Sequence, residues 1–281
     1  MSITVAKSAG FCFGVNRAIN IVNSLLDKNV KVSTLGPIIH NMEVVNELES
    51  RGCKAVENID EVEKDATLVI RSHGVPKYVI DKLDENGVKY EDATCPFVKK
   101  IHNIVANPDN KDGIVLIAGN SVHPEVEGII GHCSTECHTF KNSEEIDEIY
   151  NIVLKKNNKQ VFVVAQTTFD TKEWKKCVKK IKKLCTNAKI FDTICNATSM
   201  RQQETRRLAA ENDVMIVIGG RHSSNTAKLF DVCKEKCGRA YLIETAAELT
   251  DAMFDKCRSA GVVAGASTPA GIIKEVIKTM S

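Results

Sequence analysis

The sequence lacks the features that place a protein in a membrane or on nucleic acid. Its 281 residues contain no apolar run of about 18 residues, and the chain does not begin with a charged segment followed by an apolar one. We therefore expect no membrane span and no secretory signal, and we expect a cytoplasmic protein. The formal net charge is only +2, with 38 Lys and Arg against 36 Asp and Glu. So small an excess of positive charge does not favour binding to nucleic acid or to an anionic membrane.

Familiar cofactor motifs are missing as well. Neither the phosphate-binding pattern G-x-x-x-x-G-K-[ST] nor the dinucleotide pattern G-x-G-x-x-G occurs, which argues against a nucleotide ligand. No two cysteines have C-x-x-C spacing, so no local motif marks a metal or redox site. The chain nevertheless has 11 cysteines, an odd number, and no secretory signal. A disulfide framework is therefore not expected, and reduced thiols or metal ligands are favoured.

What the chain does contain is a threefold repeat of about 90 residues, visible when its apolar runs are compared. In each copy a strand is followed by a cysteine and a helix, and three more strands then alternate with polar turns and helical segments. The second strand of each copy ends in glycine, at Gly36, Gly119 and Gly219. Alternating strands and helices indicate parallel sheets. We predict an α/β protein of three small parallel-sheet lobes in a pseudo-threefold, trefoil-like arrangement around a central site.

The third copy is incomplete at its carboxyl end. The first two copies close with the strands that precede Cys95 and Cys195, but the chain ends before the third copy has such a strand. A matching strand occurs at the other end of the chain, in residues 3–11. We therefore predict lobes at 13–95, 96–195 and 196–281, the last completed by residues 1–12.

Three cysteines, Cys12, Cys95 and Cys195, occupy the same place in the repeat, between a strand and a helix. Ligands of parallel sheets gather at the carboxyl ends of the strands, so we expect these thiols to meet at the centre. Soft thiolate ligands select an iron–sulfur cluster, zinc or cuprous copper. Three thiolates that meet on one axis suit an iron–sulfur cluster. On a four-iron cluster, three cysteines leave one iron without a protein ligand. An open coordination position is typical of a catalytic site.

Polar residues stand at matching positions in the turns that follow the strands. Residues of this kind usually cap helices, but here they match in all three copies beside the matched cysteines. Their imidazole, hydroxyl and amide groups, together with the N–H groups of helix starts, favour phosphate or diphosphate. The positions are His40, His123 and Ser223 after the first turns, Asn225 two residues further on, and His73, Thr167 and Ser267 after later turns.

Glu125 is the one carboxylate at these inward positions. A carboxylate beside a diphosphate is unfavourable because both groups are negatively charged. We therefore predict that Glu125 has a catalytic role and delivers protons. Thr167 is expected to hold either Glu125 or a hydroxyl of the substrate.

Seven short motifs carry a resemblance that extends over essentially the whole chain. Together they closely resemble the 4-hydroxy-3-methylbut-2-enyl diphosphate reductase family, which catalyses the last step of the non-mevalonate isoprenoid pathway. The motifs are GFCFGV at 10–15, GPIIHN at 36–41, RSHGV at 71–75, ATCP at 93–96, HPEV at 123–126, SSNT at 223–226 and GASTP at 265–269.

The resemblance implies an activity and a set of roles. Members of the family reductively dehydroxylate an allylic diphosphate to isopentenyl and dimethylallyl diphosphates, with two electrons from reduced ferredoxin or flavodoxin. It implies a [4Fe–4S] cluster with one iron not ligated by protein, held by Cys12, Cys95 and Cys195. It implies Glu125 and Thr167 as catalytic residues. The implied substrate-binding residues are His40, His73, His123, Thr167, Ser223, Ser224, Asn225 and Ser267.

Two other classes of protein are compatible with the residues alone. One is a non-enzymic iron–sulfur sensor, and the other is a structural zinc protein that binds a phosphorylated ligand. The segment 132–138, which contains Cys133 and Cys137, looks like a zinc site, but its place before a repeated strand favours a structural role. The Lys-rich run 171–185 has apolar residues at helical spacing, which predicts an amphipathic surface helix. Docking of an acidic electron donor on this helix is an alternative interpretation of its charge.

Overall fold

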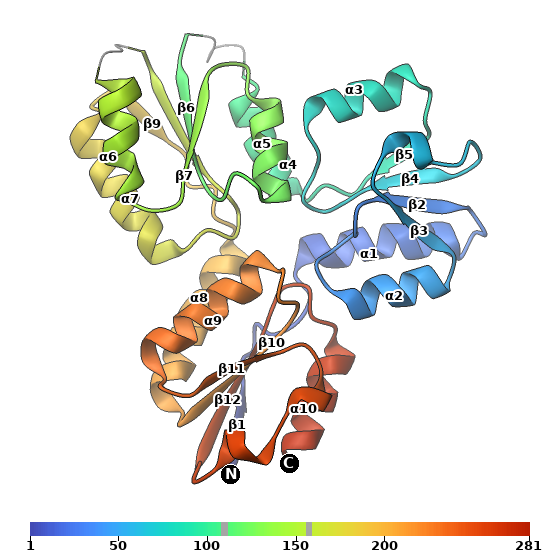
Figure 1. Cartoon of the computed structure of the whole chain (residues 1–281), viewed down its shortest axis with the longest axis vertical. Helices are drawn as coiled ribbons and strands as arrows, with labels where there is room; N and C mark the ends of the chain where they lie inside the picture. The colour runs from blue at the N-terminus through green and yellow to red at the C-terminus, as the bar shows by residue number, and fades with distance from the viewer. Residues whose placement is uncertain (108–111, 156–158) are drawn as a thin grey trace.

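The computed structural model of the chain describes residues 1–107, 112–155 and 159–281. The turn-rich segment 107–113 lies mostly outside the described residues. Three lobes surround a common centre, and helices cover both faces of the sheet in each lobe (Figure 1). All nine strand pairings in the described part of the chain are parallel. The predicted α/β architecture of three parallel-sheet lobes is thereby confirmed.

The first lobe has a sheet of order β3-β2-β4-β5. Its central strands are buried because helices pack on both faces, with Val15, Ala18 and Val22 of α1 lying in the same apolar cluster as Val32 of β2. The elements are α1 (Phe13–Leu26), β2 (Val32–Leu35), α2 (Met42–Ser50), β3 (Cys53–Val56), a 3₁₀ turn (Ile59–Glu61), β4 (Thr67–Ile70), α3 (Lys77–Glu85) and β5 (Tyr90–Asp92).

The second lobe repeats this order as β7-β6-β8-β9. Every residue of β6 and β8 is buried, as expected for strands covered on both faces. The elements are α4 (Pro96–Val105), β6 (Ile114–Ala118), α5 (Pro124–His132), β7 (Cys137–Phe140), α6 (Glu145–Ile149), a π-helical turn (Tyr150–Leu154), β8 (Val161–Ala165), α7 (Thr171–Leu184) and β9 (Ala188–Ile190).

The third lobe takes its last strand from the amino terminus. Strand β1 (Ser2–Val5) pairs with β12 in a sheet of order β1-β12-β10-β11, so β1 stands where β5 and β9 stand in the other lobes. The pairing predicted from the incomplete repeat is confirmed, and both termini lie in this lobe (Figure 1). The other elements are α8 (Asn196–Glu211), β10 (Val214–Ile218), α9 (Ser224–Lys236), β11 (Ala240–Ile243), 3₁₀ turns (Ala246–Glu248 and Asp251–Phe254), β12 (Ser259–Ala264) and α10 (Ala270–Met280).

The sequence also predicts acidic helices at 59–64, 143–150 and 245–254, after the third strand of each copy. The helix in the second lobe forms as α6 and continues through the π-helical turn to Leu154, but the other two are shorter than predicted. In the first and third lobes they are 3₁₀ turns that begin with capping boxes, Asn58 with Glu61 and Thr245 with Glu248. The residues that follow, Val62 and Leu249, are extended, so each helix ends after one turn.

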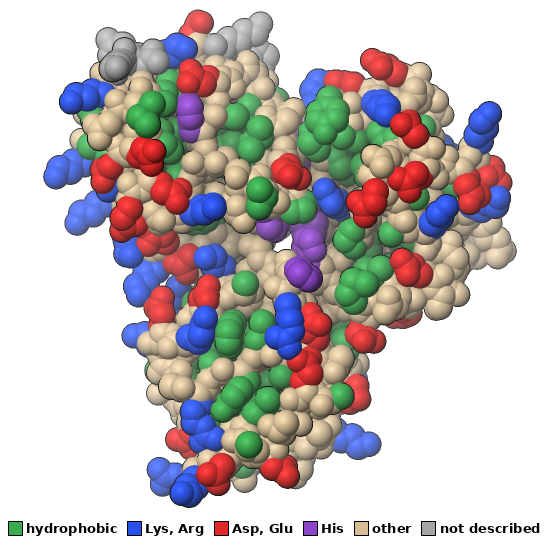
Figure 2. Space-filling view, viewed as in Figure 1, with side chains coloured by type: hydrophobic (Ala, Val, Ile, Leu, Met, Phe, Trp, Pro, Cys, Tyr) green, Lys and Arg blue, Asp and Glu red, His purple; other side chains and the backbone are tan. Residues whose placement is uncertain are grey.

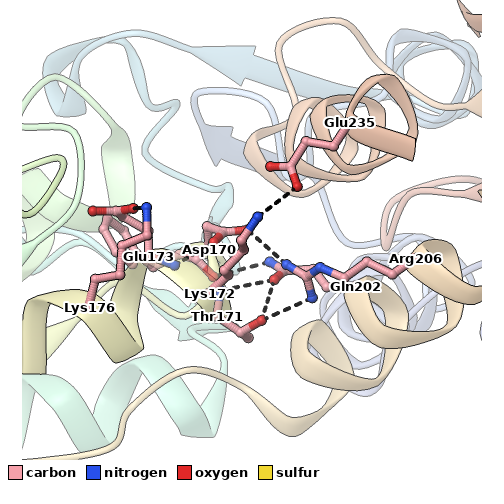
Figure 3. Close-up of polar contacts among 9 residues, drawn as sticks. Asp170, Thr171, Lys172, Glu173, Lys176, Gln202, Arg206 and Glu235 are labelled. Atoms are coloured by element: carbon pink, nitrogen blue, oxygen red, sulfur yellow. Dashed lines mark hydrogen bonds and ion pairs between the residues drawn. The ribbon is translucent and has the colours of Figure 1, made fainter. Parts of the chain in front are cut away.

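The second and third lobes are joined by polar contacts at the start of α7 (Figure 3). Arg206 of α8 donates to Asp170 at 3.2 Å and to the Thr171 hydroxyl at 3.3 Å. The side-chain oxygen of Gln202 accepts from the backbone and hydroxyl of Thr171, both at 2.9 Å. Gln202 is fully buried, so these bonds replace its lost hydration and fix the two lobes relative to each other. Within the described residues, no helix has both the length and the apolar character needed to cross a bilayer.

Candidate active site

One cavity lies where the three lobes meet, and every sequence-predicted site residue lines it. In Figure 2 the histidine side chains at the centre of the molecule lie in a hollow between the lobes. The predicted residues that line the cavity are Cys12, His40, His73, Cys95, His123, Glu125, Thr167, Cys195, Ser223, Ser224, Asn225 and Ser267.

The three matched cysteines are each the residue that caps a helix start. Cys12 precedes α1, Cys95 precedes α4 and Cys195 precedes α8. Strands β5 and β9 end at Asp92 and Ile190, before their cysteines, so the thiols belong to the helix starts and not to the strand ends. Burial raises the pKa of Cys95 and Cys195, and backbone N–H groups of the following helical turn oppose this shift. These N–H groups and the helix dipoles stabilise thiolates once a cation is present.

The three histidines form a compact group. The ring centroids of His40 and His73 are 4.6 Å apart, and His123 lies 6.0 Å from His40 and 5.7 Å from His73. Nε2 of His40 and Nδ1 of His73 are buried without a hydrogen-bond partner, and so is Nδ2 of Asn225. Buried polar groups are normally paired, so these nitrogens are suited to bind a polar ligand.

Burial keeps the histidines neutral in the free protein. It lowers the pKa of His123 to about 4, and it also lowers the pKa values of His40 and His73. Arg71 contributes to all three shifts through its positive charge. The Arg71 guanidinium lies close to Gly36, because a Cβ atom added at Gly36 would be only 2.9 Å from Nη1. The Nε atom of Arg71 has no hydrogen-bond partner. Neutral imidazoles with unpaired ring nitrogens beside a partly buried cation form a site that is suited to an anion.

The third lobe contributes hydroxyl groups that also join the lobes. The hydroxyls of Ser224 and Thr168 share a hydrogen bond of 2.9 Å, which links the third lobe to the second. The Ser267 hydroxyl donates to the His40 carbonyl at 3.2 Å, which links the third lobe to the first. Ser223 caps α9 and accepts from the Thr226 N–H at 3.3 Å. Residues that line the cavity therefore also hold the three lobes together around it.

Glu125 is held by Thr167, as the sequence predicts. The Thr167 N–H donates to Glu125 Oε1 at 2.6 Å, and the Thr167 hydroxyl donates to Oε2 at 2.8 Å. The Glu125 side chain is almost fully buried, and burial raises its pKa to about 7 against the opposing effect of these two bonds. A carboxyl with this pKa can give up and regain a proton near neutral pH.

Arg201 is a second buried cation, and it lies on the cysteine side of the cavity. Its Nη2 donates to the Gly10 carbonyl at 2.6 Å, while its Nε is buried without a partner. Burial lowers the pKa of Arg201, and the nearby Cys12 and Cys195 oppose that shift. A positive charge in this place offsets negative charge on thiolates.

Arg71, Arg201 and Thr168 were not identified from the sequence as site residues. Arg71 stands two residues before His73 in a recognised motif, which was the available signal. Arg201 lies in the middle of a polar helix, where its type and spacing resemble those of solvent-exposed arginines. Thr168 follows Thr167 directly, but only the fold shows that it meets Ser224.

The other eight cysteines do not line the cavity. All eleven are free of disulfide bonds, as expected. Cys53, Cys177, Cys185, Cys233 and Cys237 are buried. Among the described residues, no three Cys, His, Asp or Glu side chains are close enough together to hold a single metal ion, and this includes the segment around Cys133 and Cys137.

A family model described as LytB protein matches residues 3–281. The chain belongs to the LytB family. Among LytB relatives, a protein of Alkaliphilus oremlandii is 44% identical over 280 residues, which are 99% of this chain and 98% of that protein. A protein of Clostridioides difficile is 41% identical over 278 residues, with 99% and 98% of the two chains covered. Both relatives are named 4-hydroxy-3-methylbut-2-enyl diphosphate reductase.

Solved structures of LytB relatives have the same fold. A structure described as (E)-4-hydroxy-3-methyl-but-2-enyl diphosphate reductase, the terminal enzyme of the non-mevalonate pathway, is 39% identical. It superposes with a TM-score of 0.71 over 100% of this chain and 99% of that one. The reductase from Plasmodium falciparum is 27% identical, with a TM-score of 0.90 over 99% of this chain and 87% of that one. The family resemblance predicted from the motifs is confirmed.

Proposed function

We propose that this chain is a 4-hydroxy-3-methylbut-2-enyl diphosphate reductase. It replaces the allylic C–O bond of its substrate by a C–H bond, using two electrons and two protons, and releases water. The products are isopentenyl and dimethylallyl diphosphates. The observation that carries the proposal is a single cavity that joins three helix-capping cysteines, a group of unpaired imidazole and amide donors, and a buried carboxyl.

The cysteines fit an iron–sulfur cluster better than a single metal ion. Cys12, Cys95 and Cys195 share one cavity, but no three ligands in the described residues are close enough together for one ion. Three thiols around a larger group fit a [4Fe–4S] cluster with one iron not ligated by protein. When bound, the cluster supplies electrons and a Lewis acid that makes the allylic hydroxyl a better leaving group. Arg201 offsets part of the negative charge of its ligands.

The diphosphate is held by the other half of the cavity. His40, His73 and His123 offer ring N–H groups, and Asn225 offers the unpaired amide. Ser223, Ser224 and Ser267 supply hydroxyls, and the helices that start beside them supply backbone N–H groups. Arg71 adds a positive charge behind the histidines without lining the cavity. This arrangement orients the allylic end of the substrate towards the cysteines.

Protons reach the allyl group through Glu125. The carboxyl is protonated in an appreciable fraction of molecules at neutral pH, since its pKa is raised to about 7. Thr167 fixes its orientation through two hydrogen bonds and, when it rotates, can contact the substrate hydroxyl. Burial excludes bulk water from this carboxyl, so proton delivery is directed to the bound substrate.

The proposed reaction implies an electron donor and a location in the cell. Reduced ferredoxin or flavodoxin is the proposed electron donor, and the cytoplasm is the proposed location because the diphosphate and the carriers are found there. We also propose the division into 13–95, 96–195 and 196–281 with 1–12, which is supported by the origin of the strands in each sheet.

Turnover of the anaerobic, iron-loaded protein tests the proposal. Reduced methyl viologen should convert the allylic diphosphate to two isomeric products, each lighter than the substrate by one oxygen atom. A coloured protein that binds the diphosphate without reducing it would instead be an iron–sulfur sensor. A colourless protein that contains zinc would support the structural zinc interpretation.

Replacing Gly14 with alanine should prevent cluster assembly without unfolding the protein. A Cβ at Gly14 would lie 2.6 Å from Cys95 Sγ, so the thiol must move. Alanine is otherwise favourable in a helix, so the far-ultraviolet circular dichroism should be retained while most of the iron–sulfur absorbance is lost. Gly271 is the matched control, because it is also the second residue of its helix and a Cβ added there would have nothing within 4 Å. Normal absorbance in Gly14→Ala would contradict the assignment of Cys95.

Diphosphate binding should take up protons. The histidine pKa values are lowered in the free protein, and a bound anion raises them again. Affinity should therefore increase as the pH falls from mildly alkaline to neutral, by about tenfold per pH unit for each proton taken up. Titration calorimetry of substrate in buffers of different ionisation enthalpy measures this uptake. Affinity that is independent of pH, without proton uptake, would show that the histidines stay neutral in the complex.

A further inference from the structure

A basic hollow opens on the surface beside two of the three cluster cysteines. It lies between α4 and the segment that leads from β9 to α8. Pro96, which lines it, follows Cys95 directly, and Phe191, which also lines it, stands four residues before Cys195. The other lining residues are Lys99, Lys100, Asn103, Ile104, Asn107 and Lys189. The hollow therefore reaches the surface next to the ligands contributed by the closing segments of the first and second lobes.

The charges of this hollow are all positive among the described residues that line it. Lys100 is exposed and has no ion pair in the described part of the chain. Lys189 also has no ion pair in the described part of the chain, and its Nζ lies 5.4 Å from the centre of the Phe191 ring. Lys99 is paired with Asp92 at 2.5 Å. Two uncompensated cations around an apolar ring favour a partner with an acidic surface.

Phe97 follows Pro96 in α4 and lies between the cavity and the solvent, although it does not line the hollow itself. It lines the cavity together with Cys95, and it is also 44% exposed to solvent. In Figure 1, α4 lies behind α5, whereas α5 begins beside His123 on the diphosphate side. A partner bound on the α4 side can therefore come close to the cysteines without displacing the diphosphate.

We infer that this hollow is the docking site for a small acidic one-electron carrier protein, which passes electrons to the cysteine-held group past Phe97. The inference rests on the proposed reductase function. Each turnover oxidises the carrier twice by one electron. The two electrons and two protons form the new C–H bond and convert the departing hydroxyl to water.

The Lys-rich helix α7 is a less suitable docking surface. The structure confirms it as an amphipathic surface helix that buries Trp174, Cys177 and Ile181. None of its residues lines the cavity. Three of its lysines already have carboxylate partners: Lys172 pairs with Glu235, Lys176 with Glu173 and Lys180 with Asp147. The first two of these pairs are drawn in Figure 3. The other four lysines of α7 have no ion pair in the described part of the chain, so α7 is a basic control surface, and it differs from the hollow in having no residue next in sequence to a cysteine that lines the cavity.

Charge reversal separates the two surfaces. The iron-loaded double variant Lys100→Glu with Lys189→Glu is compared with Lys179→Glu with Lys182→Glu on α7, which changes the net charge equally. Turnover is measured with a purified acidic ferredoxin kept reduced by its NADPH-dependent reductase, with a flavodoxin in parallel, and separately with reduced methyl viologen.

We expect the hollow variant to need about tenfold more carrier for half-maximal rate, with a weaker dependence on salt. The α7 variant should behave like the unaltered protein, and viologen turnover should stay within about twofold in all three.

The outcomes distinguish the inference from the function on which it rests. If viologen drives no reduction by the unaltered protein, the proposed function fails. If viologen works but neither acidic carrier does, or if the hollow variant accepts carriers normally, the docking site is wrong. An equal defect in both double variants would show a general charge effect and would also overturn it. The milder pair Lys100→Gln with Lys189→Gln should give an intermediate effect if the charges act as inferred.

Discussion

Serine in place of Cys12, Cys95 or Cys195, one at a time, is expected to give a folded protein without a stable cluster and without reductase activity. Each cysteine caps a different helix, so the other two cannot replace a missing ligand from the same lobe. Serine is a hard oxygen ligand with a much less acidic hydroxyl, and it binds iron–sulfur clusters poorly. Iron content and visible absorbance of the anaerobic protein measure the loss, and circular dichroism verifies the fold.

The remaining eight cysteines provide controls in the same chain. Cys133, Cys137 and Cys257 are partly exposed like Cys12, Cys95 and Cys195, and serine there should leave the absorbance intact. The same is expected at the buried cysteines, provided that the variant folds: Cys53, Cys177, Cys185, Cys233 and Cys237. Loss of the cluster from a folded variant at any of these eight positions would mean that the threefold repeat had been misinterpreted.

Replacing Glu125 with glutamine is expected to lower the rate of reduction by about a hundred- to ten-thousandfold, the usual contribution of general acid catalysis. Glutamine has nearly the same shape, and the Thr167 hydroxyl can donate or accept, so both contacts with Thr167 can persist. Removing an anion near the diphosphate does not weaken binding of the substrate. Single-turnover reduction and substrate titration of the iron-loaded variant separate the two effects.

The pH dependence of reduction is a second test of the role of Glu125 as an acid. The acid form of Glu125 is present below a pKa of about 7 in the free protein, and it is lost as the pH rises. The kcat/KM of the unaltered protein should therefore fall above this pH by up to about tenfold per pH unit more than the substrate affinity does, and this additional fall should be absent in Glu125→Gln. His40→Ala should differ, with weaker diphosphate binding as its main defect. A glutamine variant that binds poorly but reduces bound substrate at the normal rate would make Glu125 a binding residue.

Most of the architecture could be predicted because strands, glycines and helices follow one another in the same order in all three copies. The place of β1 beside β12 followed from one missing strand, and the central meeting of Cys12, Cys95 and Cys195 followed from their matched positions. Parallel strands end at the same edge of a sheet, so residues at matching positions after these strands are expected to lie at that edge. His40, His73 and His123 converge for the same reason.

Other features depend on packing that a single sequence does not show. Arg201 is buried, and nothing in its local sequence separates it from exposed arginines. Arg71 is only partly buried, and its one sequence signal was its place two residues before His73. The contact of Thr168 with Ser224 and that of Ser267 with the His40 carbonyl arise only when the lobes come together. Helices were expected after the third strands of all three copies, but in the first and third lobes capped 3₁₀ turns form there instead.

Mössbauer spectroscopy of the protein loaded with ⁵⁷Fe tests the central claim, that each lobe supplies one thiol and one iron is left open to the substrate. We expect a four-iron cluster in which about one quarter of the iron signal changes when the allylic diphosphate is added, while the other three quarters keep their sulfur-ligated parameters. The substrate should cause no such change in Cys12→Ser, Cys95→Ser or Cys195→Ser. A spectrum in which all four irons are equivalent and unaffected by the substrate would contradict the account.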